Sequence, residues 1–116
     1  INAFPAEAYG RFGLDAAATP SEFLDARTGN DSRGFPATRE FWEGCLATCQ
    51  FEAGKLASVS LYPIDMGFGR PRGQRGRPVL ARGEDAHRIL ARVARLSRPF
   101  GTRLDIEGDV GVLRLP

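Results

Sequence analysis

The chain has few of the residue types that build catalytic and metal centres. Its 116 residues include one histidine and two cysteines, so a structural zinc site of four Cys and His ligands exceeds what it can supply. No apolar run approaches the roughly 20 residues that a membrane-spanning helix needs. The first residues, 1–5, contain no initiator methionine, basic region or signal-like segment. We therefore expect a fragment of a longer protein, and the sequence leaves its localisation unknown.

The two cysteines, Cys45 and Cys49, stand four residues apart. On a strand they would share a face about 13 Å apart, which is too far for a disulfide. On a helix they would approach more closely, although the missing ligands still exclude a zinc set. We expect two buried thiols that pack as small hydrophobic side chains.

What the chain does contain is typical of a folded domain, with 42% hydrophobic and 26% charged residues. Acids outnumber bases before residue 70, whereas arginines outnumber acids from residue 70 onward. Arginine pairs bidentately with carboxylate or phosphate, so this asymmetry indicates a polyanionic partner. A solvated arginine-rich face with no partner is the simpler interpretation, and the one we favour.

Turn and capping signals predict that the N-terminal segment, residues 1–44, is helical. Pro5 suits the first position of a short helix over residues 5–12. A second helix follows Thr19, because Thr19, Pro20 and Glu22 form a capping box. It should end near Arg27, and a turn or single helical turn should follow before residue 42.

Residues 45–116 predict a hairpin, a loop, a helix and a second hairpin. Small and apolar residues alternate with polar ones over residues 45–51, which indicates a strand. A four-residue connection over residues 52–55 should join it to a partner strand over residues 56–64. Because proline lacks an N–H donor, that strand should end at Pro63 or lie at a sheet edge.

The strongest helix signal covers residues 84–97, where an apolar stripe recurs at helical spacing. Glu84 and Arg88 are spaced for an (i, i+4) ion pair, and Pro99 with Gly101 should end the helix. Strands over residues 102–107 and 110–115 then predict the last hairpin. The apolar stripe of the preceding helix comprises Ala86, Ile89, Leu90, Val93 and Leu96.

The fold class is therefore α+β, with antiparallel hairpins and helices in a single region, residues 1–116.

The candidate substrate-binding residues lie in the glycine- and proline-rich loop that follows the first hairpin. Four like charges repel one another, so such a loop indicates either open solvent or an anionic neighbour. That neighbour would be a phosphate-bearing substrate or an anionic polymer. A nucleic acid partner is disfavoured, because Phe68 alone offers an aromatic platform nearby. A glycine-loop phosphate site is also disfavoured, because no helix directly follows Gly69. The four candidates are Arg70, Arg72, Arg75 and Arg77.

No residue is assigned a catalytic or metal-ligating role. His87 lies off the apolar stripe, so we expect a solvated helix residue with no nucleophile or carboxylate to serve. The acids of the last hairpin are expected to face solvent around its turn. They are Asp105, Glu107 and Asp109.

Several motifs follow one another in the chain: Phe41-Trp42-Glu43, the Gly54-Lys55 turn, the Leu61-Tyr62-Pro63 strand end, Arg75-Gly76-Arg77-Pro78 and Pro99-Phe100-Gly101-Thr102. Their order resembles the carboxy-terminal end of CapA-like proteins, the bacterial capsule or poly-γ-glutamate biosynthesis family. The resemblance covers most of the chain and is firmest over residues 41–102. It also implies that the helical segment of residues 1–44 is an insertion.

The resemblance implies a fold and a function. The family is similar to calcineurin-like metallophosphoesterases, which have two packed sheets with helices outside, an α/β/β/α sandwich. It implies a divalent metal held by Asp, Asn, Glu and His residues of a missing N-terminal part, with no cofactor in this chain, which alone would be inactive. A membrane anchor and an extracytoplasmic location would likewise be determined before residue 1. The alternative function is a non-enzymatic module that binds nucleic acid or another polyanion.

Overall fold

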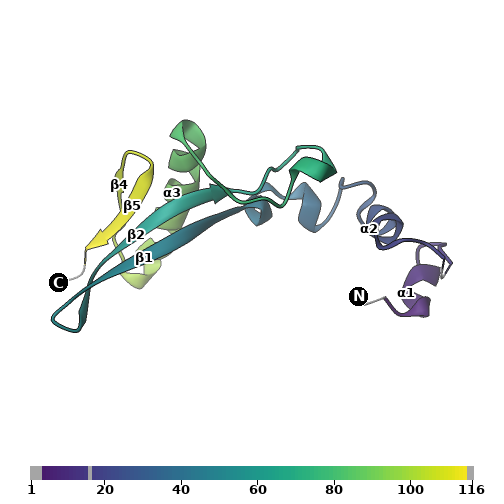
Figure 1. Ribbon diagram of the computed structural model, residues 1–116, viewed down its shortest axis with the longest axis horizontal. Helices are drawn as coiled ribbons and strands as arrows, with labels where there is room; N and C mark the ends of the chain where they lie inside the picture. The colour runs from purple at the N-terminus through teal and green to yellow at the C-terminus, as the bar shows by residue number, and fades with distance from the viewer. Residues whose placement is uncertain (1–3, 16, 115–116) are drawn as a thin grey trace. The chain divides into compact units, whose positions relative to one another are not determined.

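The computed structural model describes residues 4–15 and 17–114, and it confirms the α+β class: helices accompany one antiparallel sheet (Figure 1). The chain divides into two compact units, residues 1–41 and residues 42–116. We describe each unit by itself. The second unit starts at Trp42, so the first residue of the sheet, Glu43, belongs with the hairpins.

The first unit has two short helices, α1 (Ala6–Gly10) and α2 (Pro20–Thr28). The predicted capping box is confirmed: the Glu22 N–H donates to the Thr19 hydroxyl (3.3 Å), and the Thr19 N–H donates to the Glu22 carboxylate (2.7 Å). Hydrogen bonds from Thr19, its N–H first, lower the pKa of Glu22. The helix ends at a left-handed Gly29, where a positive φ lets the chain turn away.

Aromatic rings supply the core of this first unit, since so small a segment has few aliphatic side chains to bury. Phe23 is 3% exposed and lies at the centre of the cluster. Its ring centroid lies 5.1 Å from that of Tyr9 and 5.5 Å from that of Phe12. Aromatic pairs at such distances add stabilisation beyond their buried area.

The second unit is built on a sheet of five strands in which every pairing is antiparallel. The order is β1-β2-β5-β4, and β3 pairs with the end of β2. The strands are β1 (Glu43–Glu52), β2 (Lys55–Asp65), β3 (Val79–Leu80), β4 (Asp105–Glu107) and β5 (Val110–Arg114). Among the described residues, short 3₁₀ helices form parts of the connections: η1 (Phe35–Ala37) in the first unit, η2 (Arg39–Trp42) at the boundary between the units, and η3 (Arg72–Gln74) and η4 (Arg98–Phe100) in the second unit.

The first hairpin is confirmed, with a tighter turn than predicted. Glu52 and Lys55 pair directly, so the connection has two residues, Ala53 and Gly54. Both have positive φ, at 50° and 76°, which is the conformation of the two-residue turn that matches strand twist.

The expectation that Pro63 ends its strand or lies at an edge is wrong. Pro63 is fully buried inside β2, which continues to Asp65 between β1 and later strands. On the side away from β1, β5 reaches only as far as Leu61, while the Pro63 carbonyl accepts a hydrogen bond from the Ala81 N–H (2.9 Å). The N–H group that proline lacks would thus point into the gap between β5 and β3. No hydrogen bond between strands is lost there.

The helix α3 (Gly83–Ser97) packs on one face of the sheet (Figure 1). Its stripe is confirmed at Ala86, Ile89 and Leu90, which are at most 1% exposed. It is wrong at Leu96, which is 55% exposed. Gly111 of β5 admits this close approach, because a Cβ there would lie 2.9 Å from Leu90 Cδ2.

The N-terminus of α3 receives its cap from a distant part of the chain. Arg82, the residue before the helix, makes no side-chain capping bond. The Gly83 N–H instead donates to Asp109 Oδ1 (2.9 Å), on the turn of the last hairpin. A carboxylate at this position satisfies a free N–H and complements the helix dipole. Asp109 therefore does more than face solvent, contrary to our expectation.

Replacing Gly111 with alanine should destabilise the second unit. The added methyl group would press on the buried ends of Leu90 and Leu104, at 2.9 and 3.0 Å. We expect Gly111→Ala to lower the free energy of unfolding by about 1–3 kcal/mol, measured by urea denaturation. Gly73→Ala is the matched control, because a Cβ added at Gly73 would meet nothing within 4 Å. Equal midpoints for the two variants would contradict the packing described.

Candidate functional site

The four candidate arginines lie on one loop, residues 66–78, which we call the arginine loop. It leaves the end of β2 and closes on itself, because the Gly76 N–H donates to the Met66 carbonyl (2.9 Å). The Met66 N–H in turn donates to the Trp42 carbonyl (2.8 Å). The loop is therefore tied both to itself and to the residue that precedes β1.

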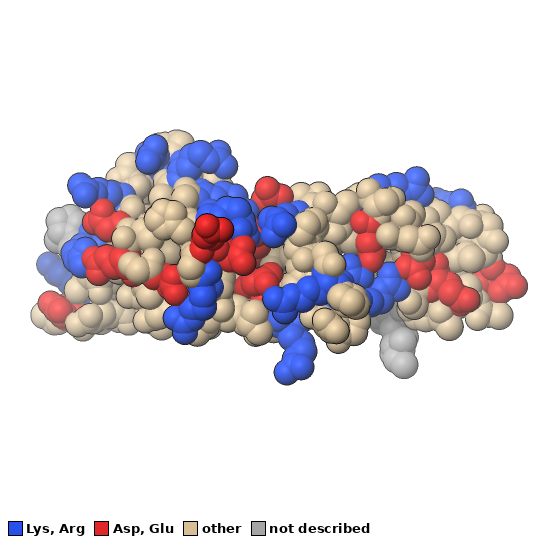
Figure 2. Space-filling view, turned by 90° about the horizontal axis from the view of Figure 1, so that it is seen from above, with Lys and Arg blue, Asp and Glu red and all other residues tan. Residues whose placement is uncertain are grey.

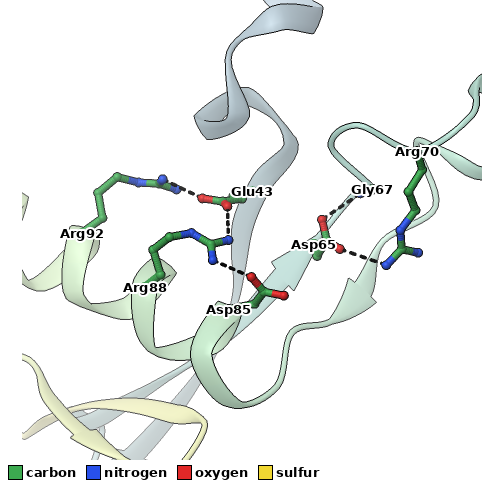
Figure 3. A network of polar contacts seen from close by, with 7 residues as sticks. All are labelled: Glu43, Asp65, Gly67, Arg70, Asp85, Arg88 and Arg92. Carbon is green, nitrogen blue, oxygen red and sulfur yellow. Dashed lines mark hydrogen bonds and ion pairs between the residues drawn. The ribbon is translucent and has the colours of Figure 1, made fainter.

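Asp65, the last residue of β2, organises the start of the loop (Figure 3). Its Oδ1 accepts from the Gly67 N–H (2.8 Å), and its Oδ2 lies 3.4 Å from Arg70 Nη2. Gly67 is buried with φ +86°, and a Cβ there would lie 3.2 Å from both Arg70 Cδ and the Gln74 carbonyl oxygen. Only glycine meets both the positive φ and this close approach.

The structure gives the four arginines different environments. Arg70 is held by Asp65, and the guanidinium of Arg75 lies over the Trp42 ring, 5.2 Å from its centroid. A cation over an indole face is attracted by the ring quadrupole. Arg72, in η3, and Arg77 are exposed. Sequence reasoning therefore located the loop, but at least Arg70 and Arg75 contribute contacts that hold it in shape.

A second polar cluster joins α3 to β1, and its centre, Glu43, was not among the predicted residues. The Glu43 side chain is 1% exposed, and its two carboxylate oxygens accept from Arg88 Nη2 and Arg92 Nη1, at 2.5 and 2.6 Å (Figure 3). Arg88 and Arg92 stand four apart on one face of α3, so both reach the same carboxylate. This buried charge is thus fully paired, as its desolvation requires.

The predicted pair of Glu84 with Arg88 is wrong. Arg88 instead contacts Asp85 and Glu43, because its guanidinium points toward the start of β1. The hydrogen bonds to Asp85 and then Glu43 raise the pKa of Arg88. No local sequence signal marks Glu43 as their partner, because it lies 45 and 49 residues before Arg88 and Arg92.

The remaining sequence candidates have ordinary structural environments. His87 is exposed, as expected. The acids of the last hairpin form ion pairs, where solvent exposure alone was expected: Arg114 pairs with Glu107 (2.6 Å) and Asp105 (3.8 Å). Hydrogen bonding to Glu107 raises the pKa of Arg114.

The expected burial of both thiols is wrong for Cys49. Cys45 is half-buried against Ala81, Ala86 and Ile89, whereas Cys49 is exposed. Burial raises the pKa of the Cys45 thiol, and the Arg92 guanidinium partly offsets that rise. The helix covers the first part of β1 and leaves the second part open, which explains the difference.

The described residues do not fit a metal ion, since they contain no group of three or more His, Cys, Asp and Glu side chains arranged to hold one. Within the same residues, no helix is both long enough and apolar enough to cross a bilayer.

Two curated proteins of Sinorhizobium fredii (strain NBRC 101917 / NGR234) are similar to this chain. They are the uncharacterized proteins y4sH and y4uA, each 45% identical to it over 75 residues. The aligned part is 65% of this chain and 16% of each relative. The chain therefore spans about 16% of the length of the curated relatives it matches. No family model matches the chain.

Removing the charge of Glu43 should weaken the attachment of α3 to the sheet. Glu43→Gln keeps the shape of the side chain but removes the buried negative charge that pairs with Arg88 and Arg92. The side chains of these arginines are 41% and 21% exposed. We expect a loss of about 2 kcal/mol or more in the free energy of unfolding, measured by chemical denaturation.

The matched control is Glu107→Gln, because Glu107 also pairs with an arginine but is 53% exposed. An exposed ion pair contributes at most about 1 kcal/mol. If Glu43→Gln were no more destabilising than this control, the Glu43 cluster would not be holding the helix.

Proposed function

We propose that this chain is the carboxy-terminal portion of a CapA-like protein that makes or handles an anionic polymer of the polyglutamate type. In this proposal the metal-dependent chemistry resides in a preceding part of the protein. The chain contributes a sheet, a packing helix and the arginine loop. That loop contacts the polymer at the rim of the site.

The shape of the arginine loop is the observation that carries this proposal. A loop closed by backbone hydrogen bonds, with Arg70 paired to Asp65 and Arg75 held over Trp42, presents its cations from a fixed frame. Arg70, Arg72 and Arg77 are exposed. Cations held on a preorganised loop bind carboxylates or phosphates with less loss of conformational freedom than cations on a mobile one.

The distribution of charge on the surface favours an anion contact that is limited to the arginine loop. Figure 2 shows basic and acidic side chains interspersed over the face in view. A nucleic-acid-binding protein typically presents a continuous basic stripe and free aromatic platforms. Here Trp42 is already covered by Arg75, so a carboxylate polymer fits the loop better than a nucleic acid does.

The relatives support the proposal that this chain is part of a longer protein, because the aligned part is only 16% of their length. We expect the reading frame upstream of this chain to encode Asp, His and Asn metal-ligand motifs. Sequencing that region tests the expectation directly. An upstream frame without such motifs would contradict the assignment to CapA-like proteins.

Charge reversal in the arginine loop should reduce binding to anionic polymers. We expect the double variant Arg72→Glu/Arg77→Glu to weaken binding of poly-γ-glutamate at least about tenfold at low salt, since two attractive contacts become repulsive. Binding by the unaltered chain should weaken as salt rises. Fluorescence titrations at two salt concentrations, with DNA and RNA as parallel ligands, measure both effects.

The control is Lys55→Glu/Arg98→Glu, which makes the same change in net charge at exposed positions outside the loop. Equal weakening by the two double variants would show a response to net charge and contradict a role for the loop. Tighter binding of DNA or RNA than of polyglutamate would support the polyanion-binding alternative.

A further inference from the structure

The two edges of the sheet in the second unit differ in how they are protected from pairing with another chain. At one edge, β4 has three residues, and two of them are Asp105 and Glu107. Short, charged edge strands are how proteins prevent unwanted strand pairing. The opposite edge, β1, has ten residues. It carries no charge and no proline between Glu43 and Glu52.

The second half of β1 is also open on both faces. Every residue from Leu46 to Glu52 is exposed, although successive side chains of a strand point to opposite sides. Leu46 is 52% exposed and Phe51 is 65% exposed. The face that carries Ala47, Cys49 and Phe51 is therefore apolar and open to water. The other face is largely polar.

We propose that the free edge of β1 pairs with a further strand of the same polypeptide, supplied by the part of a longer protein that lies outside this chain. The inference rests on the proposed function only for the existence of that longer protein. Backbone N–H and C=O groups along the free edge would then form the ladder. The chemistry of β1 defines the incoming strand: small or apolar uncharged residues opposite Leu46, Ala47 and Thr48.

The length of the relatives favours a strand of the same polypeptide over a second copy. Because the aligned part is 16% of each relative, most of such a protein lies outside the region described. A strand tethered in the same chain pairs at a high effective concentration. An uncharged edge of this length left open would instead be a site of aggregation.

Amide hydrogen exchange of the long protein and of this 116-residue chain tests the pairing. In the chain alone, the β1 amides that face β2 should exchange slowly, and the alternate ones, which face outward, should exchange fast. In the long protein the outward amides should slow by at least about tenfold. Unchanged fast exchange in a long protein that does contain the upstream metal motifs would overturn this inference and leave the proposed function standing.

A pair of proline variants provides a second readout. Ala47 and Thr48 are neighbours in a regular part of β1, so one of their N–H groups faces β2 and the other faces the free edge. In this chain alone, one of Ala47→Pro and Thr48→Pro should lower the melting temperature far less than the other does. In the long protein both should lower it strongly, and tolerance of the same variant there would refute the pairing.

A second copy on β1 would give a different result. Cys49 is exposed on β1, so two copies paired edge to edge about a two-fold axis near this residue would bring their thiols together. Mild oxidation would then yield a disulfide-linked dimer of the long protein. That dimer, lost in Cys49→Ser and retained in Cys45→Ser, would overturn the choice of a strand from the same polypeptide. Absence of any longer reading frame would instead refute the proposed function and this inference together.

Discussion

The buried carboxylate of Glu43 is the interaction on which the second unit depends. A charge that is 1% exposed is tolerated only when it is paired, and its two partners both come from α3. The carboxylate thus fixes the helix over the first residues of β1. Directly across the ladder from Glu43 is Asp65, whose carboxylate organises the arginine loop. Two opposed acids at one end of the hairpin therefore position the helix and the loop.

This arrangement explains why the arginines of the chain are unequal. Arg88 and Arg92 neutralise Glu43, Arg70 lies against Asp65, and Arg75 covers Trp42. These side chains hold elements together, so their charge is largely used within the molecule. Arginine suits such roles, because its planar guanidinium can donate several hydrogen bonds and still lie against an aromatic ring. Arg72 and Arg77 are exposed on the loop, so an external anion has access to them.

Local sequence rules predicted the features that local interactions determine. The Thr19 capping box, the alternation in β1 and the stripe of α3 each involve residues a few positions apart, and all three are present. The predictions failed where burial depends on what packs from elsewhere. Leu96 and Cys49 have the right periodicity but lie beyond the surface that the helix and sheet share. Pro63 was misjudged because its neighbouring strands stop on either side of it.

The same distinction applies to the candidate site. The density of arginines in residues 70–77 identified the loop, because like charges that crowd together are visible in any sequence. The ion-pair partners of individual arginines along the chain were not visible. The Glu43 contacts to Arg88 and Arg92 span 45 and 49 residues, so only the folded chain brings them together. Whether an arginine serves the fold or a ligand is therefore a tertiary property.

The cap that Asp109 provides for α3 has a consequence for the order in which the molecule is built. Asp109 follows Gly83 by 26 residues, so the helix can form before the last hairpin has placed this acceptor. Until the last hairpin forms, the first turn of α3 must rely on water for that hydrogen bond and is prone to fray. The helix therefore reaches its final stability only when the last hairpin has folded.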